Sequence, residues 1–477
     1  MKKLLILLVM LVAISANAQW QTDVRLTNDT AGSFTTFNNA WCVASSGSFV
    51  HVVWYDNRIG NDEIYYKRST NGGLNWESDI RLTNNASSSQ TPSIAVFGTN
   101  VHIVWEDNRD GNDEIYYKLS TNAGANWGAD TRLTNNSADS WYPSIAVTGT
   151  VVHVVWKDNR EFYDKIYYKR STDGGLNWEA DTRLTNTNAM SIYPSVAVSS
   201  SFVHVVWYDN RDGNDEIYYK RSTDGGLSWG TDIRLTNNTA YSITPSIGVS
   251  GSFVYIVWPD IRDGNYEIYY KRSTDSGINW EADTRLTNSA GSSYFSSTAI
   301  SGSDIHVVWR DTRDGNDEIY YKRSTNAGAN WEEDTRLTNN TATSYNPSVA
   351  ISGSVVHVVW YDNRDSNYEI YYKRNPTGNV GIQNINTEMP SKYSLSQNYP
   401  NPFNPTTNMK FSIVNTGEVK LVVYDIQGRE VRTLVNEFLK PGTYEAAFDG
   451  SVLNSGVYFY KLITGTFTET KKMLLIK

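Results

Sequence analysis

The sequence predicts an all-β protein whose larger part is a seven-bladed β-propeller with four-stranded blades. The motif Trp-x-Asp-x-Arg occurs seven times at a constant spacing of 51 residues, with its tryptophan at Trp54, Trp105, Trp156, Trp207, Trp258, Trp309 and Trp360. A complete unit also contains four short segments rich in β-branched and aromatic residues, separated by Gly, Asn, Asp or Ser. A period of about 40–50 residues filled with short strands is typical of propeller blades.

The ends of the repeat array indicate how the ring closes. The seventh unit stops at Lys373-Arg374 without a fourth strand, whereas an unpaired fourth-strand sequence, Trp20–Asn28, precedes the first unit. We therefore expect Val24–Thr27 to pair with Ile370–Lys373 as the outer strand of the last blade. This pairing would remove two exposed sheet edges, which otherwise favour aggregation.

The remaining segments predict four parts. Lys2 and Lys3, an apolar run and the small residues Ala16-Asn17-Ala18 are typical of a secretory signal peptide. Alternating strand patterns also follow the propeller and predict a small Ig-like sandwich. The predicted parts are a signal peptide (1–18), the propeller (19–375), a linker (376–392) and the sandwich (393–477).

Composition excludes several classes of protein. The net charge of −9 argues against nucleic acid as a partner, because such binding depends on basic patches. No stretch after the signal peptide has the ~20 apolar residues that a transmembrane helix needs. The single cysteine, Cys42, rules out a disulfide within the chain and is expected to be buried.

A turn motif recurs between the third and fourth strands of six units. Its pattern is Ser-x-(Asp/Asn)-x-Gly-x-x-Trp, and its central polar residues are Asn71, Asn122, Asp173, Asp224, Asp275 and Asn326. Asp or Asn can accept hydrogen bonds from its own turn, and Gly allows a positive φ. The motif resembles the Asp-box, or BNR repeat, of sialidase-like propellers. The resemblance implies the sialidase-superfamily fold, with the box in a structural role away from the active site.

A second resemblance concerns the C-terminus. Tyr399-Pro-Asn-Pro-Phe-Asn-Pro-Thr406 opens a segment that ends in Lys471–Lys477. This segment is similar to the type A sorting domain that the type IX secretion system recognises. The resemblance implies export by that machinery, with the mature protein secreted or held on the outer-membrane exterior.

One face of the propeller is expected to carry the candidate site. The loops between the second and third strands and between successive units emerge opposite the Asp-boxes. Aromatic faces beside planar hydrogen-bonding groups suit sugars. The candidate binding residues are Arg58, Arg109, Arg160, Arg211, Arg262, Arg313, Arg364, Tyr142, Tyr193 and Tyr345. Alternatively, Asp56 and Arg58, with their six counterparts, pair with each other as part of the scaffold.

The repeats differ from one another in three places, where we would first look for a unique site. The connection into the first unit is longer and carries Phe34, Phe37 and Trp41. The third loop reads Lys157 to Lys165, and Pro259 and Arg310 replace the usual residue after the tryptophan. Drift between repeats is the alternative explanation. The Asp-Gly-Asn-Asp-Glu loops leave calcium as an alternative to a plain tight turn, and no cofactor or metal ligand is assigned.

These observations favour a propeller that binds glycans or surface proteins through many individually weak contacts. The alternative is an exo-sialidase-type glycoside hydrolase, which would need three convergent arginines, a Tyr–Glu pair and an Asp acid/base. Seven equivalent units argue against one catalytic centre, so no catalytic residue is assigned. A purely structural partner in a surface assembly is a third possibility.

Overall fold

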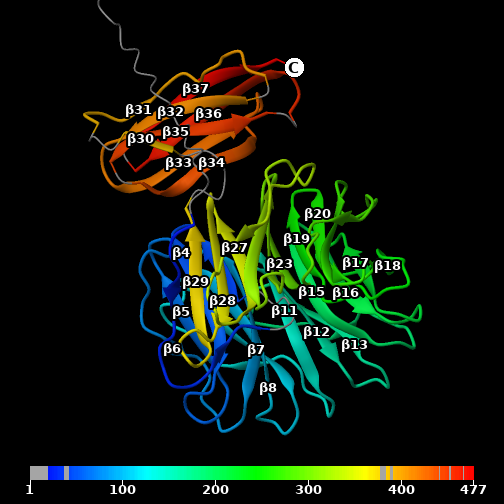
Figure 1. Cartoon of the computed structure of the whole chain (residues 1–477). Helices are drawn as coiled ribbons and strands as arrows, with labels where there is room; N and C mark the ends of the chain where they lie inside the picture. The colour runs from blue at the N-terminus through cyan, green and yellow to red at the C-terminus, as the bar shows by residue number, and fades with distance from the viewer. Residues whose placement is uncertain are drawn as a thin grey trace, which may run out of the picture.

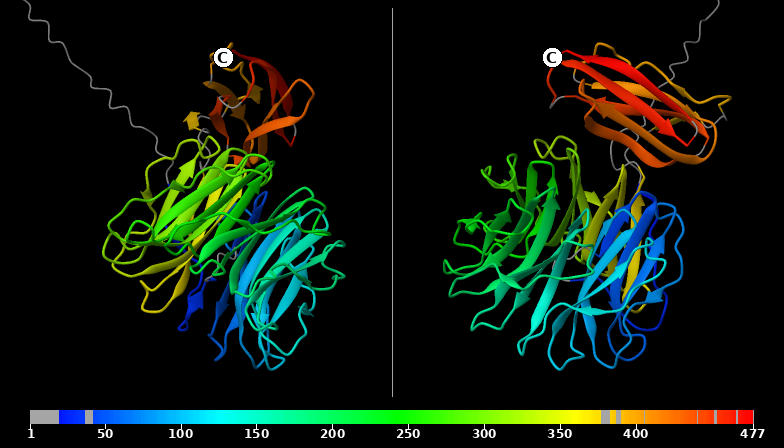
Figure 2. Two further views of the ribbon diagram at one scale, coloured as in Figure 1. Left: turned by 90° about the vertical axis from the view of Figure 1, so that its right-hand side faces the viewer. Right: turned by 180° about the vertical axis from the view of Figure 1, so that it is seen from behind.

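The computed structural model describes residues 20–36, 42–376, 383–386, 390–404, 406–439, 441–450, 453–465 and 467–476. The regular elements within these ranges are all β-strands, arranged in nine sheets. Seven sheets form a ring, and the other two form a separate sandwich beside one end of the ring (Figures 1 and 2). The predicted signal peptide, residues 1–18, lies outside the described residues.

Each blade is an antiparallel sheet whose strands we designate A to D from the axis outward. The strands of blades 1 to 4 are β2 (Ser33–Phe34), β3 (Val43–Ser46), β4 (Phe49–Asp56), β5 (Glu63–Ser69) and β6 (Ile80–Arg81); β7 (Ser89–Phe97), β8 (Asn100–Asp107), β9 (Glu114–Ser120) and β10 (Thr131–Arg132); β11 (Ser140–Thr148), β12 (Val151–Asp158), β13 (Lys165–Ser171) and β14 (Thr182–Arg183); β15 (Ser191–Ser199), β16 (Phe202–Asp209), β17 (Glu216–Ser222) and β18 (Ile233–Arg234). Those of blades 5 to 7 are β19 (Ser246–Ser250), β20 (Phe253–Asp260), β21 (Glu267–Ser273) and β22 (Thr284–Arg285); β23 (Ser293–Ser301), β24 (Asp304–Asp311), β25 (Glu318–Ser324) and β26 (Thr335–Arg336); β27 (Ser344–Ser352), β28 (Val355–Asp362), β29 (Glu369–Asn375) and β1 (Val24–Arg25). In blade 1, β2 and β3 both pair with β4 and share the place of strand A.

The ring closes as the sequence predicts. Strand β1 pairs with β29, with Val24 opposite Tyr372 and Arg25 opposite Tyr371. The backbone N–H of Leu26 continues the ladder by donating to the carbonyl of Ile370 at 2.7 Å. The N-terminal segment therefore supplies strand D of blade 7, and the prediction of a seven-bladed all-β ring is confirmed.

The propeller core lies between neighbouring blades. One cluster, for example, joins Val53 and Ile64 of blade 1 to Ile103 and Trp105 of blade 2. All seven strand-B tryptophans are fully buried. Each blade thus buries apolar side chains on both of its faces, which only a neighbour on each side can cover.

Strand A lines the axis. A cavity of about 330 Å³ is bordered there by small residues at one repeat position, namely Ala44, Ala95, Ala146, Ala197, Gly248, Ala299 and Ala350. A Cβ added at Gly248 would collide with Ile300 on strand A of the next blade, so small residues at this position let neighbouring A strands approach closely.

The histidines occupy one strand-B position in six blades. They are His51, His102, His153, His204, His306 and His357, and each ring Nδ1 lies within 2.6–2.8 Å of a strand-C tyrosine hydroxyl. Burial lowers the pKa of His153 to about 4 and that of His204 to about 3. These buried imidazoles belong to the core of the blades and lie outside the candidate site.

The C-terminal sandwich contains two four-stranded sheets. Their strands, in spatial order, are β30 (Gln383–Asn386), β35 (Gly442–Asp449), β32 (Thr406–Ile413) and β31 (Ser394–Leu395), and then β34 (Glu430–Leu439), β33 (Gly417–Tyr424), β36 (Gly456–Thr464) and β37 (Thr468–Leu475). Strand β30 lies within the predicted linker and pairs with β35, so the sandwich begins earlier than predicted. The short segment has no periodicity of its own, and its pairing depends on the distant β35.

The sandwich contacts one particular face of the propeller. Arg432 of β34 donates to both carboxylate oxygens of Asp304 at 2.9 and 3.0 Å. Asp304 begins β24, directly after the turn between strands A and B, and is 1% exposed. The sandwich therefore lies over the face that carries the A–B turns and the Asp-boxes (Figure 1). The opposite face, which we call the loop face, carries the B–C and D–A connections.

Candidate ligand-binding site

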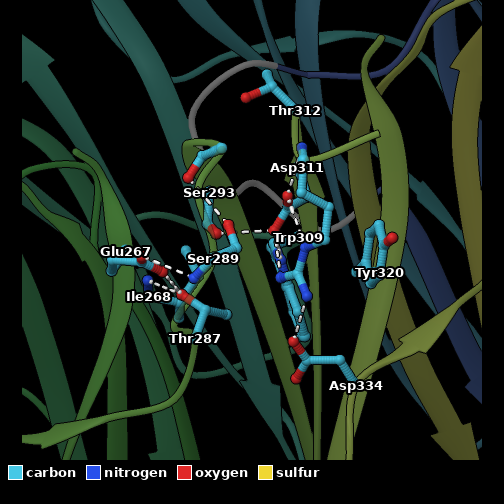
Figure 3. A network of polar contacts seen from close by, with 12 residues as sticks. Glu267, Ile268, Thr287, Ser289, Ser293, Trp309, Asp311, Thr312, Tyr320 and Asp334 are labelled. Atoms are coloured by element: carbon cyan, nitrogen blue, oxygen red, sulfur yellow. Dashed lines mark hydrogen bonds and ion pairs between the residues drawn. The ribbon is translucent and has the colours of Figure 1, made fainter. Parts of the chain in front are cut away.

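The Asp and Arg of each repeated motif form a network within their own blade. In blade 6, Asp311 accepts hydrogen bonds from Ser293 Oγ at 2.8 Å and from Trp309 Nε1 at 2.9 Å (Figure 3). Arg313 donates to Asp311 through its Nε at 2.9 Å and through a terminal nitrogen at 2.6 Å. Burial opposes ionisation of Asp311, but the hydrogen bonds from Arg313 and Trp309 lower its pKa.

The same arginine also binds outward, toward strand D. Arg313 donates to Asp334 at 2.7 Å, and its guanidinium lies 4.3 Å from the ring centroid of Tyr320. Equivalent bonds join Arg58, Arg109, Arg160, Arg211, Arg262 and Arg364 to Asp79, Asp130, Asp181, Asp232, Asp283 and Asp23, respectively. In blade 7 the partner comes from the N-terminal segment, so the network also joins the two ends of the ring.

The seven arginines therefore do not point from their blades toward one common ligand. Each guanidinium is fixed by a carboxylate of strand B, a carboxylate next to strand D and a strand-C tyrosine of its own blade. This is the pairing that the scaffold alternative describes. Direct binding of a ligand by these arginines stays a prediction.

The Asp-box residues hold the turns of the opposite face. Asp173 accepts hydrogen bonds from Asn177 N at 2.9 Å and Ser171 Oγ at 2.8 Å. The bonds from Asn177 and Ser171 lower the pKa of Asp173 to about 2. Gly175 has a φ of +92°, and a Cβ there would lie 1.9 Å from the hydroxyl of Tyr117 in the preceding blade. The box thus fixes its turn against the preceding blade.

The position that follows each strand-B tryptophan differs from blade to blade. We call these residues the variable ring: Tyr55, Glu106, Lys157, Tyr208, Pro259, Arg310 and Tyr361. They lie at the loop-face end of strand B, opposite strand-A residues such as Trp141, Tyr294 and Tyr345. After these strand-A residues, the chain bulges through a residue of positive φ, for instance Tyr142, Tyr193 or Phe295.

Blades 3 and 4 bring one group of these residues together. The Tyr142 and Tyr193 rings stack at 4.5 Å, and Tyr193 stacks on Tyr208 at 5.7 Å. Lys157 Nζ lies 3.9 Å from the ring centroid of Trp141 and 3.4 Å from an Asp164 oxygen. All of these side chains keep partial exposure. We call the group the Lys157 cluster: Trp141, Tyr142, Lys157, Tyr193 and Tyr208.

A second group lies on blades 6 and 7. The Arg310 guanidinium is 4.9, 5.1 and 5.2 Å from the ring centroids of Tyr294, Phe295 and Tyr345, and its Nε is 3.2 Å from Asp317. The rings continue through Tyr361 and Phe34 to blade 1. We call this group the Arg310 cluster: Tyr294, Phe295, Arg310, Tyr345 and Tyr361.

Glu106 lies beside the Lys157 cluster. It is 7% exposed, and its carboxyl accepts the backbone N–H of Tyr142 at 3.2 Å. Burial raises the pKa of Glu106 to about 7. The carboxyl thus changes its protonation state near neutral pH, directly next to partly exposed aromatic rings.

Acidic residues complete the inner part of the loop face. The residues that directly precede strand C, which we call the pre-C positions, are Asp62, Asp113, Asp164, Asp215, Tyr266, Asp317 and Tyr368. Asp113 accepts a hydrogen bond from Trp141 Nε1 at 2.7 Å, and Asp62 accepts one from the Gln90 amide. Asp113 and Asp62 therefore each contact strand A of the next blade.

The structure thus groups some predicted residues and adds others. Tyr142, Tyr193 and Tyr345 belong to the two clusters, and they lie on strand A rather than in the connection before it. The sequence identifies Lys157 and Arg310 as departures from the repeat, but it does not identify Glu106 or Asp113 as site residues. The available signal for Glu106 was its place in the variable ring. Phe37 and Trp41 lie outside the described residues.

The described residues contain no cluster of side chains that could bind a metal ion. There, no three or more His, Cys, Asp or Glu side chains are arranged to hold an ion. The calcium alternative and the expectation of no cofactor stay predictions. No helix among the described residues is long and apolar enough to span a bilayer.

Comparisons with known proteins agree with this architecture. The model of the BNR repeat-like domain matches residues 105–358, more than half of the chain. The chain belongs to the BNR repeat-like family. The tail of this BNR protein, residues 397–477, matches the secretion system C-terminal sorting domain. The BNR protein therefore carries a type IX sorting domain and is exported, either secreted or to the cell surface.

A search of solved structures finds similar chains at low sequence identity. The polysaccharide lyase Uly1 has a TM-score of 0.52 and 8% identity, with 76% of this chain and 100% of that chain covered. The phage phi92 endosialidase has a TM-score of 0.44 and 10% identity over 85% and 74% of the two chains. The Trypanosoma rangeli sialidase has a TM-score of 0.42 and 10% identity over 94% and 90%. A search of curated proteins finds no match to the chain.

Proposed function

We propose that this exported BNR propeller binds glycans at the inner part of its loop face, through the Lys157 and Arg310 clusters. The observation that carries the proposal is the stacked trio Tyr142, Tyr193 and Tyr208, whose rings keep partial exposure beside carboxylates. Sugar rings present apolar faces that stack on such aromatics, and their hydroxyls donate to carboxylates.

The position of the clusters also supports binding. They lie where the repeats differ. A ligand would therefore contact different side chains at blade 3 and at blade 6, and this difference can fix its orientation. The sorting domain contacts the opposite face through the Arg432–Asp304 pair. A ligand can therefore reach the loop face while the sorting domain is attached.

The alternative function, an exo-sialidase, has less support. Such an enzyme would need several arginines converging on the substrate carboxylate. The seven motif arginines bond within their own blades, and within the variable ring Arg310 is the single arginine. A raised pKa at Glu106 suits proton transfer, and this is the observation that keeps a hydrolase as the second candidate.

A glycan array probed with the mature protein tests the proposal, beside a fluorescent sialoside assay on the same preparation. We expect retention of a subset of glycans without release of the fluorophore. Fluorophore release that is lost in Glu106→Gln would establish the hydrolase instead. The absence of any retained glycan would contradict the proposed function.

A further inference from the structure

The charge of the loop face indicates which class of glycan it accepts. Within the variable ring and the pre-C positions there are six carboxyl groups and two cations. The carboxyl groups are those of Asp62, Glu106, Asp113, Asp164, Asp215 and Asp317, and the cations are Lys157 and Arg310. Even where Glu106 is protonated, five aspartates face two cations, so the inner loop face is negatively charged at neutral pH and repels a ligand that carries a carboxylate or a sulfate.

The two cations do not offset this charge for an incoming anion. Lys157 lies 3.4 Å from Asp164, and Arg310 lies 3.2 Å from Asp317. Each is thus already paired with a carboxylate of its own blade. An anionic ligand would have to compete with Asp164 for Lys157 Nζ, and it would meet the charge of Asp317 beside Arg310.

A cationic ligand meets a different obstacle. Aromatic rings beside carboxylates would otherwise suit an amine, because the ring face attracts a cation. Here the protein's own cations occupy those places, with Lys157 3.9 Å from the Trp141 centroid and Arg310 4.9 Å from the Tyr294 centroid. At these rings the resident cation offsets the attraction that the surrounding carboxylates exert on an incoming amine.

The carboxylate oxygens and tyrosine ring faces of the loop face suit a ligand with hydroxyl groups. Asp113 and Asp62 each accept one side-chain hydrogen bond from the next blade. A carboxylate has about four acceptor sites, so each can accept further bonds. The stacked rings Tyr142 and Tyr193 keep partial exposure and offer their surfaces to sugar rings.

We infer that the ligand of the loop face is a neutral glycan, recognised through hydroxyl groups and ring faces rather than through a carboxylate, sulfate or amine. This inference rests on the proposed function and specifies its ligand class. It also separates this propeller from a sialic acid-binding site, in which the ligand's carboxylate is the principal group recognised.

Matched ligands test the inference. The neutral oligosaccharide that binds best on the array is compared with two derivatives of itself, one with the primary hydroxyls oxidised to carboxylates and one with amines in their place. Calorimetric titration of the full mature chain at 20 and 500 mM NaCl measures the three affinities. We expect the acidic derivative to bind at least tenfold more weakly at 20 mM NaCl, with a smaller difference at 500 mM because salt screens repulsion. The amine derivative should bind no more tightly than the neutral parent.

Two variants locate the effect. Asp215→Asn removes one negative charge from the loop face and should reduce the discrimination against the acidic derivative by about two- to threefold. Glu179→Gln makes the same change of charge next to an Asp-box, on the opposite face, and should leave the discrimination unchanged. Equal discrimination in wild type and Asp215→Asn would show that the repulsion arises elsewhere and would overturn the assignment.

The failures of the two proposals are distinguishable. Array binding confined to acidic or amino sugars, or tighter binding of either derivative, would overturn the inference while glycan binding itself stands. A deficit of the acidic derivative that does not change with salt would also overturn it, because steric exclusion is insensitive to ionic strength. An array without any bound glycan would remove the proposed function and the inference together.

Discussion

Neighbouring positions of one strand follow opposite rules in this protein. In Trp-x-Asp-x-Arg, the Trp, Asp and Arg are identical in all seven blades, whereas the residue after Trp is Tyr, Glu, Lys, Tyr, Pro, Arg and Tyr in turn. Successive side chains of a strand point to opposite faces of its sheet. The face of the sheet with the Trp and Asp side chains therefore carries the hydrogen-bond network that every blade repeats, and the opposite face carries the variable ring.

Adjacent residues of strand B thus belong either to the scaffold or to the candidate site. Asp311 is fully buried and accepts bonds from three side chains, while the adjacent Arg310 keeps partial exposure among rings of two blades. Identical residues are required where each blade repeats the same contacts. Diversity is tolerated in the variable ring, which lies outside this repeated network, and it is there that one blade differs from another.

Removal of the closing strand should have the largest effect on the scaffold. A chain lacking Trp20–Thr27 loses the β1–β29 ladder, the buried Leu26 and the partner of Arg364. We expect the free energy of unfolding to fall by at least about 5 kcal/mol, since burial of Leu and Trp side chains alone contributes several kcal/mol. Urea denaturation measures the loss, with a chain beginning at Gln19 as the control. An unchanged midpoint would contradict the closure of the ring by this strand.

Adjacent substitutions in blade 6 test the comparison directly. Asp311→Ala leaves Arg313 and Trp309 without their shared partner, and we expect a loss of about 3–5 kcal/mol. Arg310→Ala removes a partly exposed ion pair and should cost about 1 kcal/mol or less. Urea denaturation at pH 7 measures both losses. Similar losses for the two variants would show that the variable ring is part of the scaffold.

Glu106 is predicted to give the variable ring a measurable pH dependence. Burial raises its pKa from 4.5 to about 7. Between these values the unfolded chain releases the proton and the folded chain retains it, so the folded state loses stability as the pH rises. Glu106→Gln does not titrate, and at pH 8 it should be more stable than wild type by about 3 kcal/mol. At pH 4 the two proteins should unfold at similar urea concentrations, and a constant difference across this range would contradict the raised pKa.

The sequence predicted the scaffold better than the site, for a physical reason. The number of blades follows from the 51-residue spacing of the repeats. Ring closure follows from the similarity between Trp20–Asn28 and the fourth-strand sequence Trp76–Asn84 of the first unit. Spacing and similarity can both be recognised in the sequence alone. The direction of Arg313 depends on whether Asp334, the residue before strand D, lies within reach, which only the folded blade decides. Likewise, the contact between Glu106 and the Tyr142 backbone joins two blades through a bulge of positive φ that no local pattern signals.

Two tyrosines of neighbouring blades offer the finest test of the candidate site. Tyr193 stacks between Tyr142 and Tyr208, whereas Tyr241 precedes strand A of the next blade and is 51% exposed. We expect Tyr193→Ala to weaken binding of an array-selected glycan roughly tenfold, because one stacking contact contributes about 1–1.5 kcal/mol. Tyr241→Ala removes the same side chain outside the stack and should leave the affinity within about twofold of wild type, as measured by calorimetric titration.

The binding of these two variants also decides whether the loop face has a distinct site on blades 3 and 4 or a set of similar contacts around the ring. If both variants bind like wild type, the stacked rings serve the packing between blades 3 and 4, and the loop face would need another ligand-contacting group. If both weaken binding equally, the ligand contacts the outer connections as much as the inner rings, as expected of a multivalent surface with seven similar contacts. Loss confined to Tyr193→Ala follows only if blades 3 and 4 supply a distinct site, because the repeated network is the same beneath both tyrosines.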